Sequence, residues 1–462
     1  MSELRADALV LFGATGDLAF KKIFPALQAM AASGRLDVPV IAVSRENWNI
    51  EGLRARARES VEKHGGGVDP EAFAKLAGLF RYVGGDYNDP AIFDRLRKAL
   101  GDARRPVHYL AIPPSAFPPI VQGLDRSGCA DGARVVLEKP FGRDLASAQE
   151  LNRTLHLAFD EMDVFRIDHY LGKEPVQNLV LFRLGNSFLE PIWNRNYVES
   201  VQITMAESFG VEGRGRFYEE AGAVRDVVQN HLLQVTALLA MEPPIGGDAE
   251  ALRDEKVKVV KSIRPLTGRS LVRGQYRGYR GEDNVTPNSQ VETFAAMELH
   301  IDSWRWADVP FYIRTGKCLP ITATEVMVRL RRPPQRIFSG FELPPGPPNY
   351  VRFRLGPEIE IAIGAQTKAP GEGAMRNVEL LACRDRREQV EPYDRLLGAA
   401  MEGERLLFAR EDEVESAWAV VDPILKRASS IYEYEPGSWG PSEANAIVSP
   451  IGGWHEPKPS KA

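Results

Sequence analysis

The first third of the chain repeats one pattern, a short continuous apolar run followed by a longer segment with helical periodicity. The apolar runs lie at 8–12, 38–43, 80–83, 107–112 and 135–137. The segments with helical spacing lie at 18–32, 51–63, 91–100 and 146–159. Strands that a parallel sheet buries on both faces have continuous apolar sequences. The alternation therefore predicts a doubly wound α/β domain.

A glycine-containing turn, Gly13-Ala14-Thr15-Gly16-Asp17-Leu18, directly follows the first predicted strand. Glycines there let the backbone approach a pyrophosphate, and the following helix offers free N–H groups and its positive dipole end. The spacing is G-x-x-G rather than G-x-G-x-x-G, so taken alone it fits a simple tight turn equally well. Its place at the first strand-to-helix turn favours a dinucleotide site.

Two basic residues follow later strands of the same pattern. Arg45 comes just after the second predicted strand, where NAD enzymes carry an acidic residue for the ribose 2'-hydroxyl. A basic residue suits a 2'-phosphate instead, which indicates NADP. Lys139 follows the strand at 135–137, and ligands bind outside the carboxyl ends of parallel strands. Position alone leaves Lys139 open between a ligand-facing and a surface residue.

Composition excludes several classes of partner. The net charge of -5, with both signs spread along the chain, gives no reason to expect nucleic acid or an anionic membrane. Cys129, Cys318 and Cys383 lack metal-ligand spacing, so we expect no metal site and no disulfide framework. The sequence shows no signal peptide or membrane-spanning run, and we expect a cytoplasmic protein.

The pattern changes after residue 168. A partly alternating strand at 198–205 precedes a long helical segment at 217–241, and further strands are predicted at 294–301, 326–330, 350–355 and 358–363. Strands that follow strands predict an α+β domain with a mainly antiparallel sheet. We therefore place a first domain at 1–168 and a second at 169–462. The segment 343–348 is predicted as a surface loop, and the tail 451–462 as poorly ordered.

Two further segments carry candidate chemistry. Asp168, His169 and Lys173 lie in the nine-residue segment 166–174 at the proposed domain junction. A histidine with a lysine can bind a phosphate there, and a charged loop with a hydrogen-bonded histidine fits the composition equally well. His231 shares an apolar helical stripe with Val224, Val227, Val235 and Leu238. It can be a buried structural histidine or a base that accepts a hydroxyl proton during hydride transfer.

Eight strings of the sequence together resemble glucose-6-phosphate dehydrogenase, in the order of that family and over about residues 8–440. They are GATGDLA, AIPPS, EKPFG, RIDHYLGKE, PIWNR, EGRGRFYEEAGAVRDVVQNHLLQ, RDEKVKV and VPFYIRTGK. The resemblance implies a Rossmann domain followed by an α+β domain with a large mainly antiparallel sheet. It also implies oxidation of β-D-glucose 6-phosphate at C1 to 6-phosphogluconolactone with NADP, the first step of the pentose phosphate pathway.

The resemblance also implies roles for individual residues. His231 is expected to be the general base and Asp168 its partner. The residues expected to bind the substrate are Lys139, His169, Tyr170, Lys173, Glu207, Asp226 and Lys317. The residues expected to contact NADP are Gly13, Thr15, Gly16, Asp17, Leu18, Lys22, Arg45, Asp86, Tyr87 and Lys139. A homodimer or homotetramer assembled through the large sheet is expected as well.

The sequence departs from the family pattern at Phe20 and Thr322, where the family usually has basic residues, and at Gly356, where it often has glutamine. These positions leave two alternatives open. One is the same architecture acting on another hexose 6-phosphate. The other is a non-catalytic relative that binds ligand without turnover.

Overall fold

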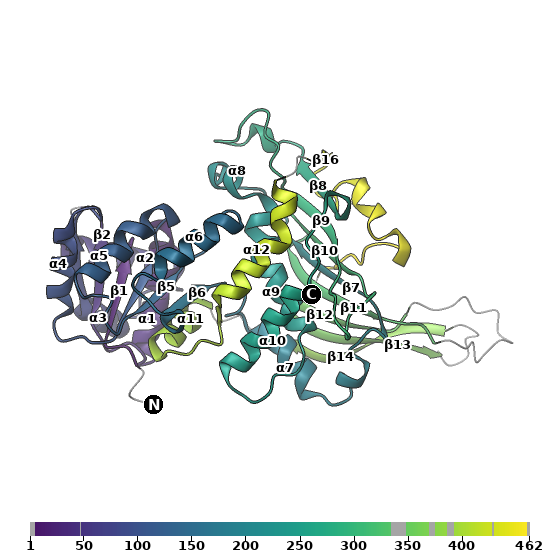
Figure 1. The fold of residues 1–462 in the computed structure, drawn as a ribbon, viewed down its shortest axis with the longest axis horizontal. Helices are drawn as coiled ribbons and strands as arrows, with labels where there is room; N and C mark the ends of the chain where they lie inside the picture. The colour runs from purple at the N-terminus through teal and green to yellow at the C-terminus, as the bar shows by residue number, and fades with distance from the viewer. Residues whose placement is uncertain are drawn as a thin grey trace. The chain divides into compact units, whose positions relative to one another are not determined.

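The computed structural model describes residues 5–46, 48–333, 348–368, 375–385, 392–426 and 429–459. The chain separates into two compact units, coloured by residue number in Figure 1. The first contains 1–173, 244–254 and 389–415, and the second contains 174–243, 255–388 and 416–462. The predicted loop at 343–348 lies outside the described residues except for its last position.

The first unit is built on a sheet of seven described strands in the order β15-β6-β5-β4-β1-β2-β3. All neighbouring pairs from β6 to β3 are parallel. The strands are β1 (Ala8–Phe12), β2 (Val40–Ser44), β3 (Phe80–Gly84), β4 (Pro106–Leu110), β5 (Arg134–Leu137), β6 (Val164–Ile167) and β15 (Phe408–Ala409). This is the doubly wound parallel sheet that the alternation predicts.

The helices of this unit are α1 (Phe24–Ala32), α2 (Ile50–His64), α3 (Pro70–Leu79), α4 (Pro90–Leu100), α5 (Phe117–Arg126), α6 (Leu145–Leu155) and α11 (Pro392–Glu402). They form two groups in mutual contact, α1 with α2, α3 and α11, and α5 with α4 and α6. The connections from β1 to β3 and those from β3 to β6 run in opposite directions along the sheet. Because parallel crossovers are right-handed, the two directions place helices on opposite faces.

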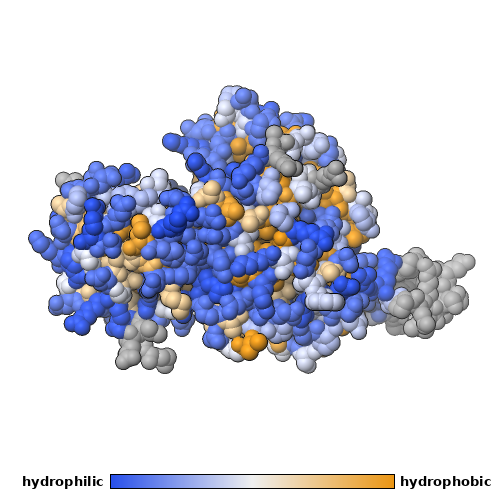
Figure 2. Space-filling view, viewed as in Figure 1, coloured by the Kyte–Doolittle hydropathy of each residue, from blue (hydrophilic) through white to orange (hydrophobic). Residues whose placement is uncertain are grey.

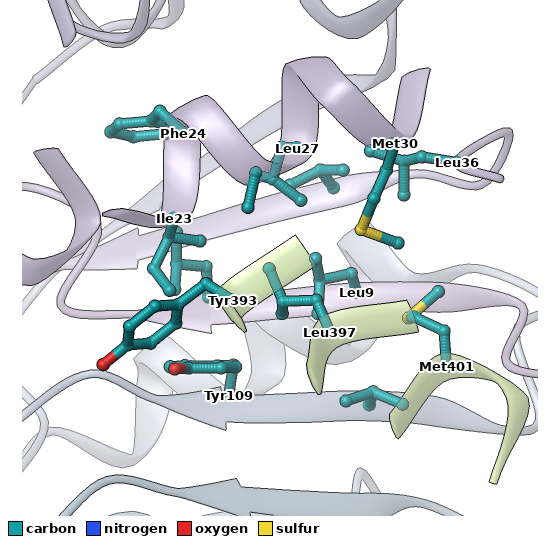
Figure 3. Close-up of a cluster of buried hydrophobic side chains, with 14 of the residues drawn as sticks. Leu9, Ile23, Phe24, Leu27, Met30, Leu36, Tyr109, Tyr393, Leu397 and Met401 are labelled. Carbon is teal, nitrogen blue, oxygen red and sulfur yellow. The ribbon is translucent and has the colours of Figure 1, made fainter. Parts of the chain in front are cut away.

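The segment 389–415 joins this unit from late in the chain. Strand β15 pairs antiparallel with β6, and α11 packs its apolar side into the core with residues of β1 and α1. Figure 3 shows Leu397 and Met401 of α11 beside Leu9, Leu27 and Met30. Local periodicity cannot reveal such a pairing, because it depends on residues more than two hundred positions apart.

The second unit is built on a sheet of nine described strands in the order β14-β13-β12-β11-β7-β10-β9-β8-β16. Its pairs are antiparallel except β7 with β10 and β8 with β16. The strands are β7 (Val198–Ala206), β8 (Leu271–Tyr276), β9 (Phe294–Leu299), β10 (Phe311–Gly316), β11 (Ala323–Leu330), β12 (Tyr350–Gly356), β13 (Ile359–Lys368), β14 (Met375–Asp385) and β16 (Ile431–Tyr434). The mainly antiparallel second sheet is thus confirmed.

The long helical segment predicted at 217–241 is broken. It consists of α8 (Gly215–Ala223), a π-helix η5 (Val224–Leu232) and α9 (Leu233–Ala240). Gly222 has φ 64° and ψ 173°, and a Cβ there would lie 2.6 Å from the Glu292 carboxylate. Further helices are α7 (Glu174–Gly185), which contacts β12 and α9, and α10 (Ala249–Ser262) and α12 (Glu411–Leu425).

The prediction of a poorly ordered tail is wrong for residues 451–459, which are hydrogen-bonded to the large sheet. Gln202 accepts from the His455 N–H at 2.7 Å, and Arg354 donates to the Lys458 carbonyl at 2.6 Å. The His455 ring also lies 2.6 Å from the Glu325 carboxylate. These long-range polar contacts have no local sequence signal.

Large hydrophobic side chains are exposed at single positions such as Leu181, Ile245 and Trp304. Figure 2 shows hydrophilic residues over most of the visible face. Among the residues that the structure describes, none of the helices combines the length and the apolar character that a bilayer crossing requires.

Candidate active-site residues of the two units

The parallel strands of the first unit end at a common edge. Five of the ten predicted cofactor residues lie one to three positions after these strands: Gly13 after β1, Arg45 after β2, Asp86 and Tyr87 after β3, and Lys139 after β5. Asp168, the predicted partner of the general base, follows β6. The carboxyl ends of parallel strands are where such sheets bind ligands. The strand order thus gathers residues that are far apart in sequence at one edge.

The glycine turn at this edge is tightly packed. Gly13 has φ 75°, and a Cβ there would lie 2.3 Å from the Ala111 carbonyl oxygen. Its N–H group donates to the Val43 carbonyl at 2.9 Å, and the Gly16 N–H donates to the Gly13 carbonyl at 2.9 Å. The chain then enters the helical run that contains Lys22 and continues into α1. The turn therefore needs glycine at position 13 and ends at a helix N-terminus, which suits a phosphate group.

Tyr87 supports this turn from the segment after β3, and Asp86 lies directly before Tyr87. The Tyr87 hydroxyl accepts from the Gly13 N–H at 3.2 Å and donates to the Val43 carbonyl at 3.4 Å. Burial raises the pKa of Tyr87 to about 12, so the hydroxyl stays protonated and available as a donor. Hydrogen bonds from Asn88, aided by the charge of exposed Arg45, hold the pKa of Asp86 below its usual value.

The loop after β6 is compact and locally bonded. Asp168 is 2% exposed, and its carboxylate accepts from the Tyr170 N–H at 3.0 Å. The Lys173 ammonium lies 3.9 Å from the centre of the Tyr170 ring, and the rings of His169 and Tyr170 meet edge to face. The first unit therefore holds Asp168, Tyr170 and Lys173 in one compact loop with His169.

A second group of candidate residues lies in the second unit, at the ends of β7 and β10. The Lys317 ammonium forms an ion pair with the Glu207 carboxylate at 2.6 Å. The Lys317 side chain is 1% exposed and also lies over the rings of Phe209 and Tyr218, at 4.8 and 5.6 Å. These contacts fix the charged end of Lys317 beside a carboxylate that is itself partly accessible.

Asp226 and His231 lie on the π-helix η5 of the same unit. His231 is 3% exposed, and its backbone N–H donates to the Asn230 side-chain oxygen at 2.6 Å. Asp226 is half-buried. The burial of Tyr218, together with the charges of Asp226 and Glu207, raises the pKa of Tyr218 well above its usual value. Glu207, Asp226 and Lys317 thus lie around one tyrosine. Residues 227–241 are buried without interruption, so the apolar stripe does not distinguish His231.

Phe209 and Tyr218 are neighbours of Lys317 that the sequence did not single out. In a sequence pattern, an aromatic residue is most simply interpreted as part of the core. Their order in the strings ESFG and RFYEE gives no hint that both rings face one lysine.

Two of the departures from the family pattern have a local structural explanation. The Phe20 ring is covered by the Arg56 guanidinium at 4.2 Å and the His64 ring at 5.4 Å. The Thr322 hydroxyl accepts from the Ser208 N–H at 3.0 Å and lies 2.9 Å from the Ser208 hydroxyl. Both residues are therefore held by neighbouring side chains.

The first unit has the parallel sheet, the glycine turn and the strand-end residues of a Rossmann-type dinucleotide-binding domain. The donors at its sheet edge suit a phosphorylated cofactor, and the ionisable residues of the second unit suit a polar substrate. These features together define a nicotinamide-dependent oxidoreductase with a large α+β unit.

Comparison with known proteins gives the family. A family model described as "Glucose-6-phosphate dehydrogenase, NAD binding domain" matches residues 10–178, and one described as "Glucose-6-phosphate dehydrogenase, C-terminal domain" matches 180–455. The chain belongs to the glucose-6-phosphate dehydrogenase family.

Individual relatives match along nearly their whole length. Glucose-6-phosphate 1-dehydrogenase 1 of Mycobacterium tuberculosis is 43% identical over 460 residues, which cover 98% of this chain and 97% of that protein. The crystal structure of the Mycobacterium avium enzyme is 42% identical with a TM-score of 0.94, covering 99% of this chain and 100% of that one. A glucose-6-phosphate dehydrogenase in complex with glucose 6-phosphate is 33% identical with a TM-score of 0.90, at the same coverage.

Proposed function

We propose that this chain oxidises β-D-glucose 6-phosphate at C1 to 6-phospho-D-glucono-1,5-lactone and transfers the hydride to NADP. This reaction is the first step of the oxidative pentose phosphate pathway. The match of both family models, over 10–178 and 180–455, is the observation that carries the proposal. The gathering of glycine turn, Arg45 and Lys139 at one sheet edge supports it.

We assign the general base to His231 and its orienting partner to Asp168. Oxidation at C1 requires a base to take the hydroxyl proton while the hydride leaves, and a neutral imidazole suits this role. A carboxylate on the second ring nitrogen fixes the tautomer and stabilises the imidazolium that forms. The burial of both side chains supports the assignment, since a dry site strengthens such an interaction.

The substrate phosphate is assigned to His169, Tyr170 and Lys173, which follow one another in a single loop. Charge-assisted hydrogen bonds from a lysine and a histidine are suited to this group. Glu207, Asp226 and Lys317 are assigned to the sugar hydroxyls. The partly accessible Glu207 carboxylate, already paired with Lys317, supports this.

NADP supplies the hydride acceptor. The backbone of Gly13, Thr15 and Gly16, with Asp17, Leu18 and Lys22 beyond it, is assigned to the pyrophosphate region. Arg45, Asp86 and Tyr87 are assigned to the adenosine side, and Lys139 to the space between cofactor and sugar. The collision that a Cβ at position 13 would make supports close backbone approach there.

Replacing Arg45 with alanine is expected to weaken NADP strongly and NAD very little. The guanidinium pairs with the 2'-phosphate that only NADP carries, and charge-assisted bonds of this type contribute about 1.5–3 kcal/mol, or roughly 10- to 150-fold in affinity. Dissociation constants for both cofactors, measured by fluorescence titration, test this. Arg54→Ala, which removes a half-buried arginine that pairs with Glu51 and donates to the Ala77 carbonyl, is the control. An equal loss for NADP and NAD would remove Arg45 from the 2'-phosphate site.

Three further assignments complete the proposal. The NADP-binding domain at 1–168 and the substrate and oligomerisation domain at 169–462 are supported by the similar division of the family models, and the compact units differ from this division by placing 169–173, 244–254 and 389–415 with the first. The chain forms a homodimer or homotetramer. Its compartment is the cytoplasm, which the three free cysteines support.

A steady-state assay of NADPH absorbance with glucose 6-phosphate tests the whole proposal. Efficient turnover with glucose 6-phosphate, and a much lower kcat/KM with galactose 6-phosphate and glucosamine 6-phosphate, is the expected result. A preference for one of the other sugars would indicate a different hexose phosphate. Absence of turnover with all three, in protein that binds NADP, would indicate a non-catalytic relative.

A further inference from the structure

A buried carboxyl group, that of Glu138, lies at the cofactor edge of the first unit, directly before Lys139 in the sequence. Glu138 follows the last residue of β5 and is 9% exposed as a residue. A carboxylate without partners in such a place is strongly destabilising. Neighbouring groups must therefore stabilise the Glu138 carboxylate.

Three donors face the Glu138 carboxylate. The Tyr109 hydroxyl of β4 donates to Oε1, and the Tyr393 hydroxyl of α11 and the Lys139 backbone N–H donate to the same carboxylate. Tyr109 is 0% and Tyr393 is 8% exposed. Figure 3 shows the two tyrosines with their hydroxyl groups close together at one side of the core cluster.

An ionised carboxylate matches this arrangement in a way that a neutral side chain does not. It accepts hydrogen bonds at both oxygens and has nothing to donate, so it satisfies all three donors at once. An amide in the same place would turn an N–H group toward another donor. The arrangement therefore joins three elements, β4, β5 and α11, to the peptide that leads into Lys139.

We propose that Glu138 is a positioning residue, whose buried carboxylate fixes the peptide of Lys139 and thereby aims the lysine side chain toward cofactor and sugar. The proposal rests on the proposed function of Lys139. Glu138, which touches neither ligand, and the two tyrosines that hold it in place thereby join the residues that the reaction requires.

The position of the charge implies a pH response. Burial raises the pKa of Glu138 to about 7, against the opposing effect of Tyr109, Lys139 and Tyr393. Because the pKa is raised, the ionised form prevails only above neutrality, and the carboxyl is half protonated at about pH 7. Protonated Glu138 has an O–H among donors, which removes one of the three bonds.

The substitution Glu138→Gln tests the proposal. Misplacement of a positioned group by about 1 Å can reduce a rate by roughly 100-fold, and we expect kcat/KM for glucose 6-phosphate to fall by roughly 10- to 100-fold. Glu161→Gln is the matched control. Glu161 also accepts from several donors, namely Arg166 and the Glu411 N–H, but it precedes β6 at the opposite edge of the sheet. We expect Glu161→Gln to leave kcat/KM within about threefold of wild type.

A double-mutant cycle with Lys139→Met shows whether Glu138 acts through Lys139. If it does, Glu138→Gln added to Lys139→Met costs less than about threefold more, because the group that Glu138 positions is already gone. A full additional loss in the Lys139→Met background would overturn the proposal.

The ratio of wild-type to Glu138→Gln activity against pH provides a readout that a purely structural role would not change. Titrations of the substrate, the cofactor and other side chains affect both proteins and cancel in the ratio. We expect the ratio to be largest near about pH 8 and to shrink several-fold toward about pH 5.5, where wild-type Glu138 is also neutral. A ratio independent of pH would overturn the proposal. Failure of the proposed function would look different, because the wild type itself would not turn over glucose 6-phosphate.

Discussion

Replacing His231 with asparagine is expected to lower kcat by roughly 10²- to 10⁴-fold, the usual contribution of a positioned general base. Asparagine keeps a similar size but cannot take up the C1 hydroxyl proton. KM for glucose 6-phosphate should change little, because the phosphate and sugar contacts are assigned to other residues. Steady-state kinetics with saturating NADP measures both quantities.

His300→Asn is the matched control for this experiment. His300 lies in the same unit, half-buried and paired with Glu298 at 3.2 Å, and has no assigned role. It should leave kcat unchanged. If His231→Asn keeps turnover within a few-fold of wild type, His231 is not the base.

Replacing Gly13 with alanine is expected to lower the free energy of unfolding by about 2–4 kcal/mol and to abolish measurable NADP binding. The new Cβ would lie 2.3 Å from the Ala111 carbonyl oxygen, so the end of β4 or the turn itself has to move. A shift of the turn changes the backbone that is assigned to the pyrophosphate, and a shift at Ala111 moves the segment that packs against the turn. Thermal unfolding and fluorescence titration with NADP measure the two effects.

Gly34→Ala separates the collision from the backbone conformation. Gly34 has φ 71°, close to the 75° of Gly13, but a Cβ there meets nothing within 4 Å. It should cost only about 1–2 kcal/mol for the left-handed conformation and leave NADP binding intact. Equal losses in the two variants would show that the close approach at Gly13 is unimportant.

The first sheet could be predicted from sequence because each of its strands and helices is marked by a pattern of neighbouring residues. Buried parallel strands are continuous apolar runs, and each is followed by its own helix. This pattern gave β1 to β5 nearly to the residue, and the structure places Arg45 and Lys139 just after β2 and β5, as the predicted strands imply. The alternation of strands and helices does not reveal β15 and α11 as parts of this unit, because their partners lie in the first half of the chain.

The prediction of the candidate residues in the second unit rests on the family resemblance instead. The spacing of Glu207, Asp226 and Lys317 in the sequence does not predict that all three lie near Tyr218. The break at Gly222 was missed because an apolar periodicity continues through it. The string EKPFG gives no sign of a role for Glu138, since its surroundings include two tyrosine hydroxyls that only the fold brings to it.

The late segment 389–415 has a consequence for how the polypeptide matures. A nascent chain emerging from the ribosome can form β1 to β6 early, but the side of the core that Leu397 and Met401 fill stays open until almost the whole protein has been synthesised. Tyr393 arrives at the same time, so the anchor of Lys139 is among the last contacts to form. A fragment that ends before residue 389 would therefore expose apolar surface and should be prone to aggregation rather than behave as an independent nucleotide-binding module.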